Sequence, residues 1–178
     1  ICPACRAGYR DRFDEDMPPT LTPQVRQFRE EVLVDLLGEL VAHVAAAGGR
    51  STICLLPSVD GLHAVDSWEP VAALPDLDTL CTDPYWSFFG RDATEFVGDL
   101  SRRVVELSRR HDLTPQIWIQ GFRLAPEQAD EIHAAVAAAR AAGVDDLWTW
   151  GYEACGHMSH LDTDRADEVW EILTDAMT

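Results

Sequence analysis

The sequence contains no lysine, so all 14 basic side chains are arginines, and they face 31 aspartates and glutamates. The formal net charge at pH 7 is −17. Nucleic acids and anionic membrane surfaces are bound by clustered lysines and arginines, and this charge balance argues against both as partners.

Long apolar segments are also missing. No apolar run approaches the roughly 20 residues that a membrane-spanning helix needs, and no signal peptide is recognisable. We assign no compartment on this basis, although the composition favours a soluble, cytoplasmic protein. The chain begins with Ile1-Cys2, without a methionine and inside a motif, which predicts that it is a piece of a longer protein. Missing targeting signals therefore carry little weight.

Several motifs that would identify an activity are absent. The sequence has no glycine-rich phosphate loop, no Gly-x-Ser-x-Gly element and no dinucleotide-binding fingerprint. Its five cysteines are an odd number without dense spacing, which argues against a disulfide-stabilised scaffold. Cys54 and Cys81 lie inside apolar segments, and we expect both to be buried.

The remaining composition is that of a globular protein. The 178 residues are 47% hydrophobic and 25% charged, enough for one domain over residues 1–178 with a sizeable core. After a loop-like opening over residues 1–16, helical and strand-like segments follow one another. We predict helices over 22–47, 92–111, 126–140 and 165–177, strands over 51–57, 77–82, 115–121 and 144–151, and a loop over 58–76.

Strands that alternate with helices and carry nearly continuous apolar runs predict an α/β fold whose parallel strands are buried on both faces. Four such βα units could form a small open sheet or half of an eight-stranded barrel. Complete barrels typically need about 250 residues. We favour the second half of a TIM-type (β/α)8 barrel, strands five to eight.

The most informative segment is Leu77–Trp86, where an apolar strand stops at Asp83-Pro84. Proline cannot donate a hydrogen bond to a sheet and pushes the residue before it into an extended or turn conformation. Asp83 should therefore lie at the carboxyl end of a strand, where parallel α/β folds present their functional groups. The same segment is equally consistent with an Asp83 that only caps a turn.

The other predicted strands also end in polar and aromatic residues. In a parallel fold these ends face the same way, and together they offer carboxylates, an amide and aromatic rings, a combination that suits sugar recognition. Two carboxylates on either side of a glycosidic bond can also hydrolyse it. The catalytic candidates are Asp83 and Glu153, and the substrate-binding candidates are Asp60, Tyr85, Trp86, Gln120, Trp150 and Tyr152. Trp118 and Trp148 fit the core as well as a site.

Metal or redox chemistry is a further possibility. Cys2-Pro-Ala-Cys5 can be half of a structural zinc site, with Cys155, His157 and His160 as candidate further ligands. It can equally be two cysteines without a special role. It can also be a dithiol couple, although such a pair normally follows a strand and begins a helix in a thioredoxin-type fold, which the rest of the chain does not match.

The chain resembles the C-terminal half of the (β/α)8 glycoside hydrolases. The opening Cys2–Phe13 segment is similar to the cysteine-rich segment after the fourth barrel strand in several of them, including cysteine-cluster β-galactosidases. The resemblance implies a structural zinc at Cys2 and Cys5, no other cofactor, and a general acid upstream of Ile1. It also implies that the rest of the barrel is a partner of these strands.

One position departs from that pattern. The strand-seven nucleophile of these enzymes falls near Gln120, which is not a carboxylate. Asp83 or Glu153 would then have to serve, or the acetamido group of the sugar itself. Our leading hypothesis is a glycoside hydrolase acting on a carbohydrate. The alternatives are a non-catalytic barrel that binds a carbohydrate or another ligand, and a metal-dependent hydrolase or lyase that uses His157 and His160 with Asp83.

Overall fold

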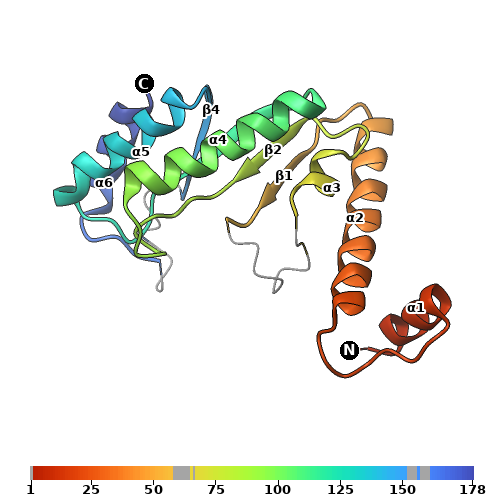
Figure 1. Ribbon diagram of the computed structural model, residues 1–178. Coiled ribbons are helices and arrows are strands. Elements are labelled where there is room, and N and C mark those ends of the chain that lie inside the picture. The colour runs from red at the N-terminus through yellow and green to blue at the C-terminus, as the bar shows by residue number, and fades with distance from the viewer. Residues whose placement is uncertain (1, 58–64, 66, 152–155, 157–160) are drawn as a thin grey trace.

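The computed structural model describes residues 2–57, 65, 67–151, 156 and 161–178. Their centre is a sheet of four parallel strands, β1 (Thr52–Leu55), β2 (Thr79–Thr82), β3 (Thr114–Gln120) and β4 (Asp146–Trp150), in the order β1-β2-β3-β4 (Figure 1). Each strand pairs with its neighbour along the chain. The predicted fold class, parallel βα units in an α/β arrangement, is confirmed.

Helices connect the strands and precede the first one. They are α1 (Pro3–Phe13), α2 (Pro23–Ala46), α3 (Glu69–Ala72), α4 (Ala93–His111), the short 3-10 helix η1 (Pro126–Gln128), α5 (Ala129–Ala141) and α6 (Ala166–Met177). The Thr22 hydroxyl accepts the Val25 backbone N–H at the start of α2, and the Asp92 carboxylate accepts that of Glu95 at the start of α4. Both caps lie where the sequence predicts helix starts.

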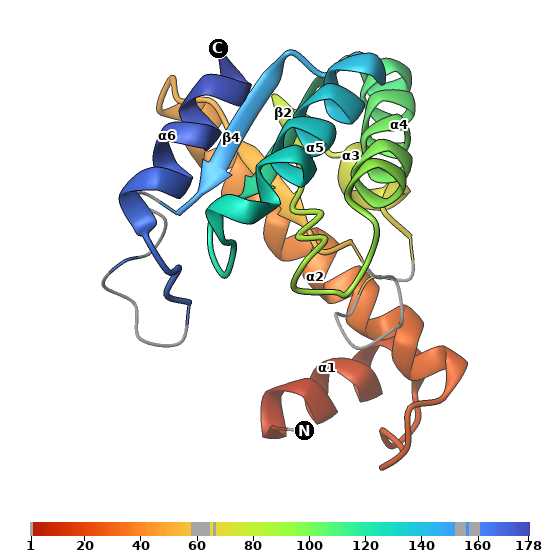
Figure 2. The same cartoon turned by 90° about the vertical axis from the view of Figure 1, so that its left-hand side faces the viewer.

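The core lies between the sheet and helices α4 and α5, which run side by side (Figures 1 and 2). Ile117 and Ile119 of β3 are fully buried in this layer. Because side chains alternate along a strand, Gln116, Trp118 and Gln120 point to the opposite face of the sheet. That second face is the one that positions the candidate site.

The second face of the sheet is partly open to solvent. Trp148 and Trp150 on β4 are 54% and 42% exposed, and Cys54 on β1 is exposed too. The prediction that the strands are buried on both faces is therefore wrong for β1 and β4 within the described residues. Cys81 is buried as predicted, but Cys54 is not, because it lies on the open face.

The opening segment is a helix rather than a loop. Helix α1 begins at the Cys2 cap and packs Tyr9 and Phe13 against Phe28 of α2, and the Tyr9 hydroxyl donates to Gln24 at 2.8 Å. Proline at its first position and the sulfur cap explain the helix start. The predicted loop over 58–76 likewise contains the short helix α3, whose Glu69 binds His111 of α4.

Helix α2 lies where it was predicted, but its own apolar side chains are spread over both its buried and its exposed faces. Val25, Phe28 and Val41 are buried, whereas Val32, Leu36 and Leu40 are exposed. The helix therefore packs through only part of its apolar surface.

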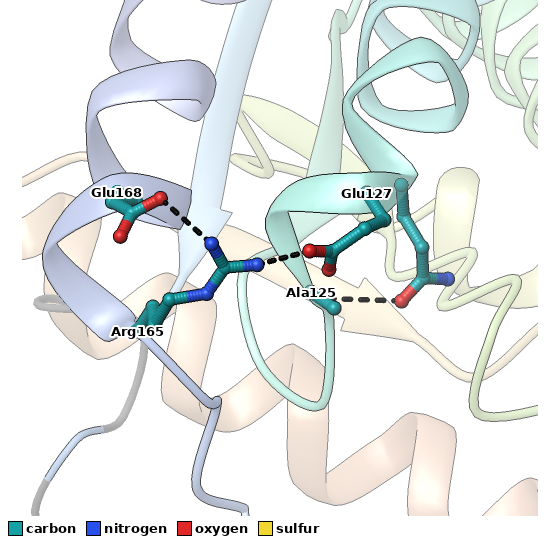
Figure 3. A network of polar contacts seen from close by, with 5 residues as sticks. Ala125, Glu127, Arg165 and Glu168 are labelled. Carbon is teal, nitrogen blue, oxygen red and sulfur yellow. Dashed lines mark hydrogen bonds and ion pairs between the residues drawn. The ribbon is translucent and has the colours of Figure 1, made fainter.

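On the carboxyl side of the sheet, one arginine joins the β3–α5 connection to the start of α6 (Figure 3). Arg165 forms ion pairs with Glu127 of η1 and with Glu168 of α6. Nearby, the Gln128 side chain accepts the Ala125 backbone N–H at 3.0 Å. The ion pairs of Arg165 thus join η1 to the start of α6.

Candidate functional site

Asp83 directly follows the last residue of β2, at the carboxyl end of the strand, as predicted. The last registered pair between β2 and β3 is Thr82 with Ile117, so Asp83 lies level with Trp118. Continued alternation from Cys81 directs its side chain toward the open face of the sheet. This is the edge of a parallel sheet at which functional groups gather.

The Asp83 carboxyl is half-buried, and its Oδ1 atom is buried without a hydrogen-bond partner in the described part of the chain. Burial raises the pKa of this carboxyl to about 6, from an ordinary value of 3.8. A carboxyl of this kind is neutral in mildly acidic solution and can donate a proton.

Beside Asp83, three indole rings stack on the open face. The ring of Trp118 lies 6.0 Å from that of Trp148 with 14° between the planes, and 6.2 Å from that of Trp150 with 22°. Trp118 comes from β3, and its two partners come from β4, where their spacing of two residues places them on one face. The stack forms an apolar, partly exposed surface.

Hydrogen bonds hold two of these rings in place. The Gln116 amide donates to Asp146 at 2.7 Å and accepts the indole N–H of Trp118 at 2.7 Å. Asp146 also accepts the indole N–H of Trp148 at 2.9 Å. The two indole N–H groups are thus turned toward Gln116 and Asp146, which orients the rings.

Trp150 is positioned by its backbone. Gly121, the first residue after β3, lies so close to Trp150 that a Cβ atom on Gly121 would be 2.8 Å from the Trp150 carbonyl oxygen. Only glycine permits this approach. The end of β3 can therefore lie directly against Trp150.

Gln120 does not offer its amide to a ligand. It is fully buried, its oxygen accepts the Ser87 and Phe88 backbone N–H groups at 3.1 and 3.4 Å, and its nitrogen donates to the Phe122 carbonyl at 2.7 Å. The predicted contact with sugar hydroxyls is replaced by a link between the loop after β2 and the loop after β3. Sequence alone places Gln120 at the strand end but does not reveal these three partners.

Trp86 also differs from its predicted role as a stacking surface. Its side chain is 1% exposed, and its indole N–H donates to Glu131 of α5 at 3.0 Å. The ring therefore lies in the core, with its polar edge satisfied by the first turn of α5. Tyr85 remains partly exposed, with its ring edge-on to Phe122 at 4.9 Å.

Asp60, Tyr152 and Glu153 lie outside the described residues, as do Cys155, His157 and His160. Of the predicted set, the structure brings Asp83, Tyr85 and Trp150 to the carboxyl edge of the sheet.

Two residues that sequence reasoning missed support the site, and two more were left undecided. Gln116 and Asp146 orient the indoles, and Trp118 and Trp148 belong to the stack rather than to the core. The signal was present as alternation: polar or aromatic residues recur at every second position along β3 and β4. This alternation indicates that the two faces of these strands differ.

The Cys2-x-x-Cys5 pair lies at the opposite end of the described chain, where the two sulfur atoms are 3.2 Å apart. Structural zinc takes four ligands, and this pair supplies two. The described residues contain no group of three or more His, Cys, Asp or Glu side chains placed to hold a metal ion. The predicted zinc stays a prediction, and its further candidate ligands lie outside those residues.

Of the described helices, none combines the length and the apolar character that crossing a bilayer requires.

The arrangement of the elements is similar to that of the endo-beta-1,4-mannanase from Thermotoga petrophila, with a TM-score of 0.52 and 12% sequence identity. The similarity covers 84% of this chain and 41% of that chain, so this chain spans less than half the length of the mannanase. At this identity the likeness shows the fold, part of a β/α barrel. No family model matches the sequence, and no curated protein matches it either.

Proposed function

We propose that this chain is the carbohydrate-binding and catalytic half of a β/α-barrel glycoside hydrolase. The observation that carries the proposal is the position of a half-buried carboxyl, Asp83, level with a partly exposed stack of three indoles at the carboxyl edge of a parallel sheet. Indole faces bind the apolar face of a pyranose ring. A carboxyl of raised pKa can protonate the oxygen of a glycosidic bond.

In this mechanism Asp83 takes the role of general acid, which the resemblance alone would place upstream of Ile1, and it enters the reaction protonated. As the bond from the anomeric carbon to the leaving oxygen breaks, Asp83 gives its proton to that oxygen and becomes a carboxylate. A second carboxylate either activates water or attacks the anomeric carbon. We assign that role to Glu153, which follows β4. A separation of about 5 Å between the two carboxyls would give retention of configuration, and about 6.5 to 9.5 Å would give inversion.

The same arrangement supports a binding protein without catalysis. Burial alone accounts for the raised pKa of Asp83, with no contribution from another carboxylate of the described residues. If Glu153 is not its partner, the indole stack remains a sugar-binding surface and turnover is absent.

The open face of the sheet also supports a partner. In a closed eight-stranded barrel, this face would be covered by four further strands, and the outer edges of β1 and β4 would be paired. We propose that further βα units, on the same polypeptide or another, complete the barrel around the indole stack.

The test uses the purified protein with a panel of β-linked oligosaccharides, including manno-, gluco- and galacto-configured chains. Tryptophan fluorescence measures binding, and reducing-end assays measure hydrolysis. We expect Asp83→Asn to abolish hydrolysis while the fluorescence response to sugar remains. The control is Asp99→Asn, which changes an exposed residue of the outer helix α4. This variant should hydrolyse the oligosaccharide at the wild-type rate.

The outcomes separate the two functions. Binding without hydrolysis by the unaltered protein would support the binding protein and overturn the hydrolase. The absence of both binding and hydrolysis over the whole panel would overturn the carbohydrate proposal altogether.

A further inference from the structure

The first turn of α1 brings two thiols together. Cys2 caps the helix, Cys5 lies one turn further on, and their sulfur atoms are 3.2 Å apart. A disulfide needs an S–S distance of about 2.05 Å, so an approach of roughly 1 Å would join them. Both residues are exposed, and both are free thiols. The pair is therefore accessible and close to bonding geometry.

The helix start favours the thiolate of Cys2. Its sulfur accepts the Cys5 backbone N–H at 3.4 Å. This hydrogen bond stabilises negative charge on the Cys2 sulfur. The positive end of the helix dipole acts in the same direction. A thiol with this environment is the natural attacking group of the pair.

The turn is held in place by the contact between α1 and α2. Tyr9 is buried against Phe13 and Phe28, with ring centroids at 4.8 and 5.4 Å. The Arg12 guanidinium also binds Glu31 of α2 at 3.0 Å. Cys5 borders the resulting groove between the two helices, a hollow of about 410 Å³ that Phe28 and Val32 also line. The second thiol thus faces open space rather than the core.

The chain contains its own matched comparison. Cys54 and Cys81 are partners in register on β1 and β2, but Cys81 is completely buried. The hydrogen bond with Cys54 and then burial raise the pKa of the Cys81 thiol. Both thiols of the first pair are thus exposed, whereas one thiol of the second pair is closed off from solvent.

We propose that Cys2 and Cys5 form an oxidisable dithiol that undergoes exchange with low-molecular-weight disulfides. The Cys2 thiolate attacks one sulfur of the small disulfide, forms a mixed disulfide and expels the other half as a thiolate. The Cys5 thiol then gives its proton to solvent and attacks the Cys2 sulfur, which releases the second half. Two protein thiols are oxidised to one disulfide, and one small disulfide is reduced to two thiols.

The experiment exposes the reduced, chelator-treated protein to oxidised glutathione at pH 7.5, a working pH typical of thiol exchange. Free thiols are then alkylated, and the protein is digested with trypsin. The peptide that ends at Arg6 holds both Cys2 and Cys5, and Cys54 and Cys81 share another peptide. Mass spectrometry therefore reads the two pairs separately. We expect the Arg6 peptide to lose two hydrogens and both alkylation sites while Cys81 remains reduced.

Variants test the order of the steps. Cys5→Ser should stop at a mixed disulfide on Cys2, because the second thiol is missing. Cys2→Ser should react at least tenfold more slowly, because the remaining thiol lacks the cap environment. Cys81→Ser is the matched control and should form the Cys2–Cys5 disulfide at the normal rate.

Two results would overturn the proposal. One is a wild-type protein that stays reduced or accumulates a stable mixed disulfide without closing the pair. The other is one zinc ion per chain, found before chelation, that is lost in Cys2→Ser and whose presence blocks oxidation. That result would make the pair part of a metal site. Neither result depends on the sugar assays, so this proposal and the proposed function fail independently.

Discussion

The indole of Trp118 on β3 lies 6.2 Å from the indole of Trp150 on β4, with 22° between the ring planes. The indole of Trp118 on β3 therefore packs against Trp150, the last residue of β4. Since Trp118 contacts Trp148 in the same way at 6.0 Å, the two strands together present one aromatic surface. The first prediction tests the proposed role of this surface in sugar binding.

Trp150→Ala should weaken oligosaccharide binding about tenfold or more, because a ring that stacks on a pyranose contributes an amount comparable to an aromatic pair, roughly 0.5–1.5 kcal/mol, plus its buried area. Isothermal titration of the wild type and the variant measures the change. Trp170→Ala, on the outer helix α6, is the comparison and should bind sugar normally. Equal affinities for all three proteins would remove the indole stack from the site.

Asp83→Asn should change how stability depends on pH. Since the folded protein holds the Asp83 proton up to about 6 and the unfolded chain releases it near 3.8, the free energy of unfolding falls as pH rises through that window. Two pH units correspond to about 3 kcal/mol. Solvent screening at this partly exposed group reduces the expected loss to about 1–2 kcal/mol.

The variant cannot ionise at this position, so its free energy of unfolding should lack that decline. Relative to the wild type, it should gain stability between pH 4 and pH 7 in urea denaturation. Parallel curves for both proteins across this range would show that the carboxyl titrates normally in the folded state.

The rate of hydrolysis should fall as pH rises through about 6, because Asp83 must be protonated to act as the acid. The pH profile of kcat/KM reports this ionisation in the free protein. A profile that stays flat from pH 5 to pH 8 would mean that another group supplies the proton.

Gln120→Leu should destabilise the protein by about 2–3 kcal/mol, because it leaves the Ser87 and Phe88 N–H groups and the Phe122 carbonyl without their buried partner. Thermal and urea unfolding measure this loss. Gln27→Leu, on the surface of α2, should stay within about 0.5 kcal/mol of the wild type. A loss as small as that of the control would mean that the loop after β2 does not depend on Gln120.

Trp86→Phe should cost about 1–3 kcal/mol of stability, because the hydrogen bond to Glu131 is lost and a smaller ring fills the same buried space. Sugar affinity should remain unchanged in the folded variant, in contrast to Trp150→Ala. A fall in affinity without a loss of stability would return Trp86 to the site.

The order and the type of the four βα units were predictable because strand-like and helical periods alternate along the sequence. The position of Asp83 at a strand end followed from the proline after it. The directions of the side chains in the loop after β2 were not predictable. Tyr85 and Trp86 are adjacent in sequence but diverge in space, since Tyr85 stays partly exposed while Trp86 enters the core. Such choices depend on α5, whose Glu131 lies 45 residues further along the chain than Trp86.

Helix α1 was missed for a related reason. Its three arginines and its aspartate leave no clear apolar stripe, and Tyr9 and Phe13 form a core only because Phe28 of α2 packs against them. The indole stack was hidden in a similar way. Tryptophans inside strands fit a buried sheet as well as an open one, and only the exposure of β4 decides between them.

The strand order of the sheet has a consequence for how such a fold can be assembled and modified. Each described strand pairs only with its neighbours along the chain. A βα unit can therefore be added beside β1 or beside β4 without rethreading the chain. The architecture is modular, and its curvature and closure can be set by the number of units rather than by a change within any one of them.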